Sequence, residues 1–345
     1  MSAISQLLFR RGIKLSGSDI KESRLINELR NLGARIFMGQ ASRNVEGADF
    51  VVYSTAIKED NPEIIEAKKR HIPLLQRAQA LAELMKDKTV ITVTGSHGKT
   101  TTASLVSLML LEAGSKPSLA IGGILKNIEN NACFGEGRFF VAEADESDGS
   151  FLCYRPDYSL ITNIDREHLD YYKSFDNEIL AFREFINRTA PGGCLFFCND
   201  DLNLKSALNG YKNRQISFGL SPGADIYADN IEIKWLNSEF DCFYKNKFLD
   251  RFLLALGGRH NISNSLAVIA LGMELGIAPE IIKKTLAGFK GARRRIDVKF
   301  NDNRYLLIDD YAHHPTEIMA TLAALRNLRG RVIAIFQPHR YTRTK

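Results

Sequence analysis

The chain has 345 residues, of which 45% are hydrophobic and 25% charged, and its formal net charge is +6. This length predicts two or three domains, and the composition is typical of a soluble globular protein. No apolar run approaches the ~20 residues of a membrane helix, no signal-peptide pattern opens the chain, and the basic residues are not bunched, so we expect a cytoplasmic protein without membrane insertion or nucleic-acid binding.

The first part of the chain alternates short helices and strands. Helices are predicted at residues 2–11 and 24–32, and strands near residues 13–15, 34–39 and 48–56. Such alternation is typical of a parallel α/β sheet. The strand and phosphate-binding turn that would open a first βαβ unit are not in the sequence, so residues 1–80 are predicted to form an incomplete Rossmann-like domain.

A second α/β region is predicted at residues 81–293. Its expected elements are strands at 138–145, 158–165 and 193–200, a β-rich stretch at 215–256 and a helix at 261–276. Residues 294–345 then supply two strands, at 304–311 and 331–337, around one helix. Because two strands and a helix cannot bury a self-sufficient core, this last domain is also expected to be incomplete.

The segment TGSHGKTTT, residues 94–102, lies between a buried strand and a helix. It is a shortened Walker pattern, in which Gly95 and Gly98 let backbone N–H groups turn toward an anion at a helix N-terminus. Lys99 adds a point charge, and Thr100 offers a hydroxyl to Mg²⁺. An ordinary strand-to-helix turn is the alternative, but the order strand, loop, helix favours a phosphate-binding loop.

Two polar clusters follow later strands of the same region. VAEADESDGSF places Glu143, Asp145, Glu146 and Asp148 at one strand end, and TNIDREHLDYY places His168 after the next. A solvated acidic turn and a structural histidine are the alternatives. Ligands of α/β sheets gather at the carboxyl ends of strands, so three such ends carrying a phosphate loop, acids and a histidine predict a metal-nucleotide site.

Six ordered motifs together resemble the Mur ligases of peptidoglycan synthesis, and the resemblance extends over essentially the whole chain. They are TGSHGKTTT, EADESDGSF, TNIDREHLDYY, GRHNISNSLAVIA, DDYAHHPTEI and FQPHRYTRTK. The resemblance is strongest to the members that join L-alanine to UDP-N-acetylmuramate. It implies a three-domain α/β fold: a UDP-sugar domain at residues 1–80, a central ATPase domain at 81–293 and an amino-acid domain from 294.

The resemblance also implies roles for particular residues. Lys99, Glu143 and His168 would be catalytic, with Thr100 and Glu143 binding one Mg²⁺ and His168 helping to bind a second. The expected ATP contacts are Gly95, Ser96, His97, Gly98, Lys99, Thr100, Thr101, Asn261, Asn264, Arg295 and Asp310. The expected sugar-nucleotide contacts are Asp19, Ser54, Thr55 and Arg77, and the expected alanine contacts are Tyr311, His313, Arg340 and Arg343.

The residues themselves support some of these roles. Asn261 and Asn264 lie on one helix face, although a helix cap and a surface polar residue would give the same spacing. Arg340 and Arg343 suit a carboxylate because guanidinium groups pair bidentately with planar anions, while a nonspecific basic end is the alternative.

Three other functions remain open from the sequence. One is a murein-recycling ligase that attaches a tripeptide to the same sugar nucleotide. The motif DDYAHHPTEI modestly favours the alanine-adding members over this alternative. The second is a nucleotide-binding chain without ligase activity, and the third a kinase-like enzyme with a stable phosphorylated product. Since pieces of both flanking domains are expected to be missing, the chain as given is expected to have negligible ligase activity.

Overall fold

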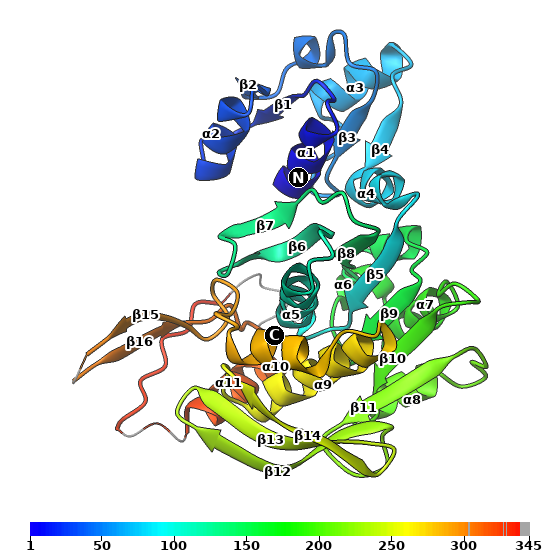
Figure 1. Ribbon diagram of the computed structural model, residues 1–345. Helices are drawn as coiled ribbons and strands as arrows, with labels where there is room; N and C mark the ends of the chain where they lie inside the picture. The colour runs from blue at the N-terminus through cyan, green and yellow to red at the C-terminus, as the bar shows by residue number, and fades with distance from the viewer. Residues whose placement is uncertain (303, 327, 329, 339–345) are drawn as a thin grey trace.

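The computed structural model describes residues 1–302, 304–326, 328 and 330–338 (Figure 1). A large central sheet with its helices forms the body of the molecule. The first elements of the chain lie at one end of this body, and the last elements pack beside it (Figure 1).

The first elements form two small parallel sheets, β1–β2 and β3–β4. The elements are α1 (Ser2–Arg10), β1 (Ser16–Asp19), α2 (Arg24–Asn31), β2 (Arg35–Met38), η1 (Ser42–Val45), β3 (Val51–Tyr53), α3 (Pro62–Lys69), β4 (Leu74–Gln76) and α4 (Arg77–Met85). The strand predicted near residues 13–15 is wrong, because the strand is the SGSD segment Ser16–Asp19, whose residue types are typical of turns. Pairing with β2, where Ser16 lies opposite Arg35, outweighs the turn propensity of these residues.

Ten strands form the central sheet in the order β14-β13-β12-β11-β10-β9-β5-β8-β6-β7. The strands are β5 (Thr89–Thr94), β6 (Ser118–Leu125), β7 (Asn130–Cys133), β8 (Phe139–Glu143), β9 (Tyr158–Ile161), β10 (Cys194–Cys198), β11 (Gln215–Gly219), β12 (Ile226–Lys234), β13 (Asn237–Tyr244) and β14 (Lys247–Leu254). β5 pairs in parallel with β8 and β9. Because parallel strands end on the same edge, the segments after these three strands meet there.

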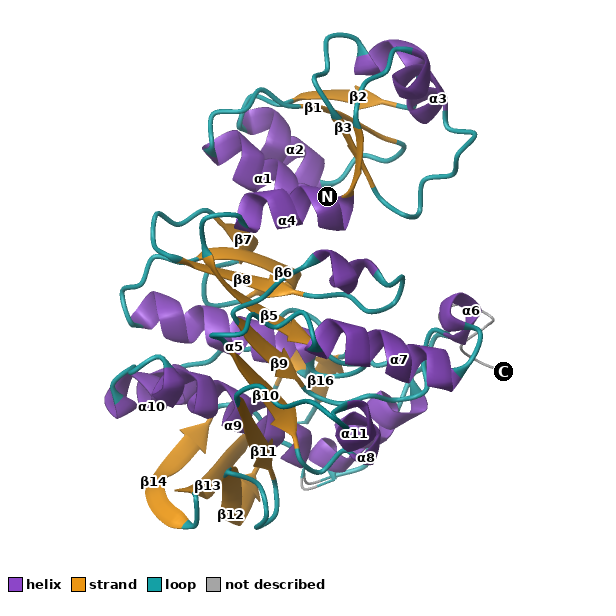
Figure 2. Cartoon of the chain, turned by 90° about the vertical axis from the view of Figure 1, so that its right-hand side faces the viewer, coloured by secondary structure: helices purple, strands orange, loops and turns teal. Residues whose placement is uncertain are grey.

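Helices cover both faces of this sheet (Figure 2). They are α5 (Lys99–Glu112), η2 (Ser150–Cys153), α6 (Leu169–Tyr172), α7 (Phe175–Ile186), α8 (Leu202–Ala207), α9 (Arg259–Glu274) and α10 (Pro279–Ala287). α5 packs between the sheet and α9 and α10, and its residues 100–110 are all buried. A helix buried on every side keeps a fixed position, so the loop that leads into it is held firmly.

The last elements are β15 (Asp297–Asn301), β16 (Leu306–Asp309) and α11 (Pro315–Leu325). β15 and β16 form an antiparallel hairpin, and Ile296 and Ala324 pack with Leu236 in a small second core. The strand predicted at 331–337 is not formed, since these described residues carry no strand pairing and Ile335 is 94% exposed. Within the described chain, no helix combines the length and apolarity needed to cross a membrane.

Candidate active site

Two glycines shape the loop between β5 and α5. Gly95 has φ +124°, and a Cβ there would lie 2.2 Å from Thr162 Oγ1. Gly98 has φ +85°, and a Cβ there would lie 2.6 Å from Asn264 Oδ1. Both positions therefore need glycine for backbone conformation and for close packing, and Asn264 of α9 lies directly against the loop.

The segment after β9 holds this loop from the other side. Asn163 Oδ1 accepts the backbone N–H of His97 at 2.9 Å, and the Asn163 carbonyl accepts that of Ser96 at 3.1 Å. Thr162 Oγ1 donates to the His97 carbonyl at 2.5 Å. The loop is thus fixed by polar contacts to the neighbouring strand end, as expected of a preorganised phosphate cradle.

Lys99 begins α5 and turns back over the loop. Its Nζ donates to the carbonyls of Gly95 and Ser96 at 2.6 and 2.9 Å, and to Glu146 Oε1 at 2.7 Å. Burial lowers the pKa of Lys99, but the carboxylates of Glu146 and Asp145 outweigh it and raise the pKa overall. Lys99 therefore carries a full positive charge at the centre of the loop.

Thr100 and Glu143 bring two hard oxygen donors together at the ends of α5 and β8. Thr100 Oγ1 lies 3.1 and 3.0 Å from the two carboxylate oxygens of Glu143. The backbone N–H of Gly122 donates to the same carboxylate at 2.8 Å. Burial raises the pKa of Glu143. A hydroxyl and a half-buried carboxylate next to a phosphate loop fit the oxygen ligands that Mg²⁺ prefers.

His168 forms a second polar group close by. Its Nε2 lies 3.4 Å from both Glu146 Oε1 and Glu167 Oε2. Burial lowers the pKa of His168, but these two carboxylates outweigh it and raise the pKa to about 9. Donor atoms of Glu146, Glu167 and His168 lie within 4.8 Å of one another, a spacing that suits a second cation.

A cavity of about 870 Å³ extends from the pair of Thr100 and Glu143 to His168. Glu143 and His168 line it, and Ser54, Thr55 and Arg77 line it from the first part of the chain. Thr55 and Arg77 also touch the acidic segment after β8. Thr55 Oγ1 donates to Asp148 at 2.8 Å, and Arg77 lies 3.9 Å from Asp145.

Asp19, also a predicted sugar-nucleotide contact, does not lie with Ser54, Thr55 and Arg77 at the cavity. It ends β1, its carboxylate accepts the backbone N–H of Lys21 at 3.1 Å, and it does not line the cavity. The expected role for Asp19 came from the family resemblance, and the geometry of this structure does not bring it to the other candidates.

Two further predicted ATP contacts, Asn261 and Thr101, lie in the first turns of α9 and α5. Asn261 Nδ2 donates to the Gly257 carbonyl at 2.8 Å, and α9 begins after Gly258 without a side-chain cap, so the helix-cap alternative for Asn261 is wrong. Thr101 is buried in the first turn of α5, one residue beyond Thr100.

The segment before α11 contributes the remaining described candidates. Asp310 accepts the backbone N–H groups of Ile296 and Ala312 at 2.7 and 2.8 Å, which fixes the turn that follows β16. Tyr311 lies under the guanidinium of Arg295, 5.5 Å from the ring centroid, and His313 Nδ1 lies 2.9 Å from the Tyr311 carbonyl. Arg340 and Arg343 lie outside the described residues.

Glu317 and Asp165 join this segment to the phosphate loop, and neither was among the predicted contacts. His97 Nε2 lies 2.9 Å from Asp165 Oδ2, and its Nδ1 lies 3.5 Å from Glu317 Oε1. Thr316 Oγ1 donates to Asp165 at 2.7 Å, and Arg295 lies 3.6 Å from Glu317. The signal for Glu317 was the HPTE sequence, in which a glutamate three residues after an N-cap closes a capping box.

Comparison with known families matches three parts of the chain. The profile of the Mur ligase middle domain matches residues 93–272, that of the Mur ligase family catalytic domain matches residues 1–89, and that of the Mur ligase glutamate ligase domain matches residues 294–345.

Curated relatives match the whole chain. The UDP-N-acetylmuramate–L-alanine ligase of Endomicrobium trichonymphae is 43% identical over 100% of this chain and 77% of its own length. The enzymes of the same name from Geobacter sp. strain M21 and Aquifex aeolicus are 45% and 44% identical over 100% of this chain and 75% and 76% of their own lengths.

Solved structures agree in fold. The UDP-N-acetylmuramate-alanine ligase of Thermotoga maritima has a TM-score of 0.84 and 29% identity, covering 95% of this chain and 75% of that one. The UDP-N-acetylmuramate:L-alanyl-γ-D-glutamyl-meso-diaminopimelate ligase of Neisseria meningitides has a TM-score of 0.78 and 26% identity, covering 85% and 96%. The predicted fold is confirmed, and the chain belongs to the Mur ligase family.

Proposed function

We propose that this protein uses ATP to join L-alanine to UDP-N-acetylmuramate in peptidoglycan precursor synthesis, in the cytoplasm. The relatives that match the whole chain at 43 to 45% identity carry the name of this activity. The observation in the structure that carries the proposal is the partly buried contact of Thr100 with Glu143 beside Lys99, which places a pair of Mg²⁺-type oxygen donors next to a phosphate loop.

ATP is proposed to bind along the loop of residues 95–101. The backbone N–H groups and the N-terminus of α5 suit the β- and γ-phosphates, and Lys99 supplies a charge that burial has not removed. Asn264, Arg295 and Asp310 are proposed to contact the nucleotide.

Two Mg²⁺ sites accompany the nucleotide in this proposal. Thr100 and Glu143 would hold one ion, and His168 would help to hold another with Glu146 or Glu167. Bound Mg²⁺ neutralises the charge that builds on a transferring phosphoryl group.

The cavity beside these residues is the proposed site of the sugar nucleotide. Ser54, Thr55 and Arg77 line it opposite Glu143 and supply hydroxyl and guanidinium donors for phosphate oxygens. Tyr311 and His313, together with Arg340 and Arg343, are proposed to hold alanine.

This arrangement suits two successive displacements. The lactyl carboxylate of the sugar nucleotide attacks the γ-phosphorus, and ADP leaves with the bonding electrons. The amine of alanine then attacks the acyl carbon of the acyl phosphate, loses a proton, and expels inorganic phosphate to leave an amide. A carboxylate is a poor electrophile, so phosphorylation supplies the leaving group, and Lys99 stabilises the phosphoryl group in transfer.

The test is a coupled assay of ADP release with UDP-N-acetylmuramate and ATP. Release that requires L-alanine supports the proposal. Release that requires the tripeptide L-alanyl-γ-D-glutamyl-meso-diaminopimelate, and not alanine, would assign the protein to recycling. Release with UDP-N-acetylmuramate alone would indicate a kinase, and no release with either amine would indicate a nucleotide-binding chain without ligase activity.

Substitution of Arg340 or Arg343 by alanine is expected to raise the KM for alanine much more than the KM for ATP. An equal increase of both KM values would contradict the proposed role of these arginines.

A further inference from the structure

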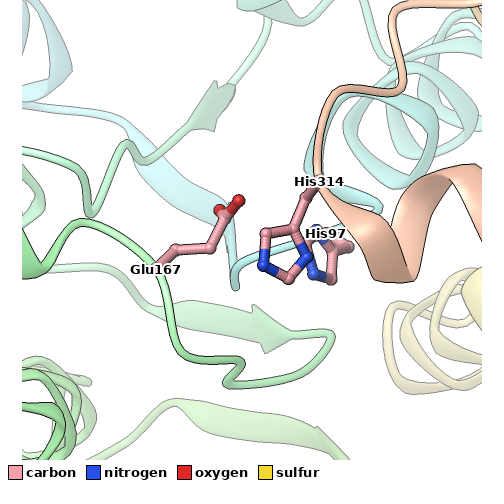
Figure 3. Close-up of side chains that lie close together, drawn as sticks. All are labelled: His97, Glu167 and His314. Atoms are coloured by element: carbon pink, nitrogen blue, oxygen red, sulfur yellow. The ribbon is translucent and has the colours of Figure 1, made fainter. Parts of the chain in front are cut away.

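A further set of possible metal ligands lies at the contact between the phosphate loop and α11. It is distinct from the pair Thr100 and Glu143. Figure 3 shows His97 from the phosphate loop, Glu167 from the segment after β9 and His314 from the N-cap of α11, with the carboxylate of Glu167 pointing toward the two imidazoles. One donor atom from each of the three residues lies within 4.8 Å of the others. The three side chains are 14%, 7% and 18% exposed, so the cluster is largely shielded from water.

The surroundings of the cluster are rich in negative charge. Asp165 Oδ2 lies 2.9 Å from His97 Nε2 and 3.6 Å from His314 Nδ1. Glu317 Oε1 lies 3.5 Å from His97 Nδ1 and 3.6 Å from Arg295. Three carboxylates thus converge on two imidazoles, so a divalent cation among them would be electrostatically favoured.

The donor types indicate which cation would bind. Two imidazoles and one carboxylate are the ligands of Zn²⁺ and similar transition metals, whereas Mg²⁺ prefers oxygen donors such as those of Thr100 and Glu143. Donors around a tetrahedral Zn²⁺ at about 2.0 to 2.1 Å lie about 3.3 Å apart. A set within 4.8 Å needs a contraction of up to about 1.5 Å, which side-chain rotation can supply.

The outer contacts also resemble those of a metal site. Histidine ligands usually place their second ring nitrogen against a carboxylate, which fixes the ring and its tautomer. Asp165 lies 2.9 Å from Nε2 of His97 and can take this role, while Nδ1, which lies 3.5 Å from Glu317 and makes no hydrogen bond within the described residues, can bind the ion.

We propose that His97, Glu167 and His314 bind one transition-metal ion of the Zn²⁺ class, which leaves Glu146 as the carboxylate beside His168 for the second Mg²⁺. The ion joins the phosphate loop, the β9 end and the start of α11, three segments that are far apart in the sequence. Binding of the ion therefore holds the start of α11 against the phosphate loop.

The experiment uses Co²⁺ as a spectroscopic probe of the metal-stripped protein, with Mg²⁺ present at saturation to occupy oxygen-donor sites. Wild-type protein is expected to bind one Co²⁺ with the visible d–d bands of a low-coordinate site. His314→Ala is expected to lose these bands and at least about tenfold in affinity, measured by competition with a chromophoric chelator. His71→Ala, at an exposed histidine of the first part of the chain, is the matched control and is expected to bind as wild type does.

Two further readouts separate this site from the neighbouring one at His168. X-ray absorption of the Co²⁺-bound wild-type protein is expected to show two imidazoles on the ion, whereas the group of Glu146, Glu167 and His168 can supply one. Equal Co²⁺ affinity and spectra for wild type and His314→Ala, or fewer than two imidazoles on the ion, would overturn the proposal. None of these readouts depends on ligase activity, and the absorption measurement needs no variant.

Discussion

Replacement of Lys99 by methionine tests the phosphate loop most sharply, because it removes the charge and keeps the aliphatic stem. The positive charge of Lys99 has two roles. It is the proposed partner of the transferring phosphate, and it pairs with Glu146, whose side chain has no exposed surface. The substitution should therefore reduce both turnover and stability.

The stability loss follows from the buried pair. Removing one partner of such a pair costs about 3 to 5 kcal/mol. The His168 ring remains 3.4 Å from the same Glu146 oxygen, so we expect the lower end, about 3 kcal/mol. For a unit of 150 to 250 residues this lowers Tm by about 6 to 12 °C. The double variant Lys99→Met/Glu146→Gln also removes the carboxylate that Lys99 contacts directly, so it should recover much of that loss.

Turnover should not recover with stability. Two hydrogen bonds to charged phosphate oxygens, at about 1.5 kcal/mol or more each, correspond to a loss of at least about a hundredfold. Calorimetric Tm and coupled ADP release are measured for the wild type, the single variant and the double variant. Full turnover by folded Lys99→Met would remove the phosphate-loop assignment, and restored turnover in the double variant would mean that Lys99 only neutralises Glu146.

Two other substitutions test the loop backbone and the junction before β15. Gly98→Ala combines a left-handed backbone with a Cβ 2.6 Å from Asn264, so the KM for ATP should rise by about tenfold or more, and an unchanged KM would show that the loop adapts freely. Burial raises the pKa of Asp297, but Lys126 and Lys299 outweigh it and lower the pKa to about 2 from 3.8. The ionised Asp297 thus contributes about 2 kcal/mol above pH 3.8, a contribution that is lost as the pH falls toward about 2. Asp297→Asn should unfold more easily at pH 7 and differ little from wild type near pH 2, and equal stabilities at pH 7 would contradict the pair.

The phosphate loop and the acids after β8 could be predicted because each lies within a few residues of its strand. A glycine pattern and a strand end fix such a site locally, and the parallel order of β8, β5 and β9 then brings the ends together. The SGSD strand could not be predicted, since its conformation depends on pairing with β2 and not on its own turn-forming residues.

The contact between the phosphate loop and α11 could not be predicted for a different reason. Thr316 and Asp165 are 151 positions apart, and their meeting depends on how the last elements pack on the central sheet. Glu317 closes the capping box of α11, and the same carboxylate also faces His97 and Arg295. Local sequence indicates the cap, but only the packing shows the second role.

The central claim is that ATP activates a carboxylate of the sugar nucleotide before alanine attacks. The direct test uses UDP-N-acetylmuramate labelled with ¹⁸O in the lactyl carboxylate, with ATP and L-alanine, and mass spectrometry of the inorganic phosphate. Attack of that carboxylate on phosphorus predicts one ¹⁸O in the phosphate for each amide formed, with ADP in equal amount. Amide formation without ¹⁸O in the phosphate would contradict an acyl-phosphate intermediate and the mechanism proposed for this site.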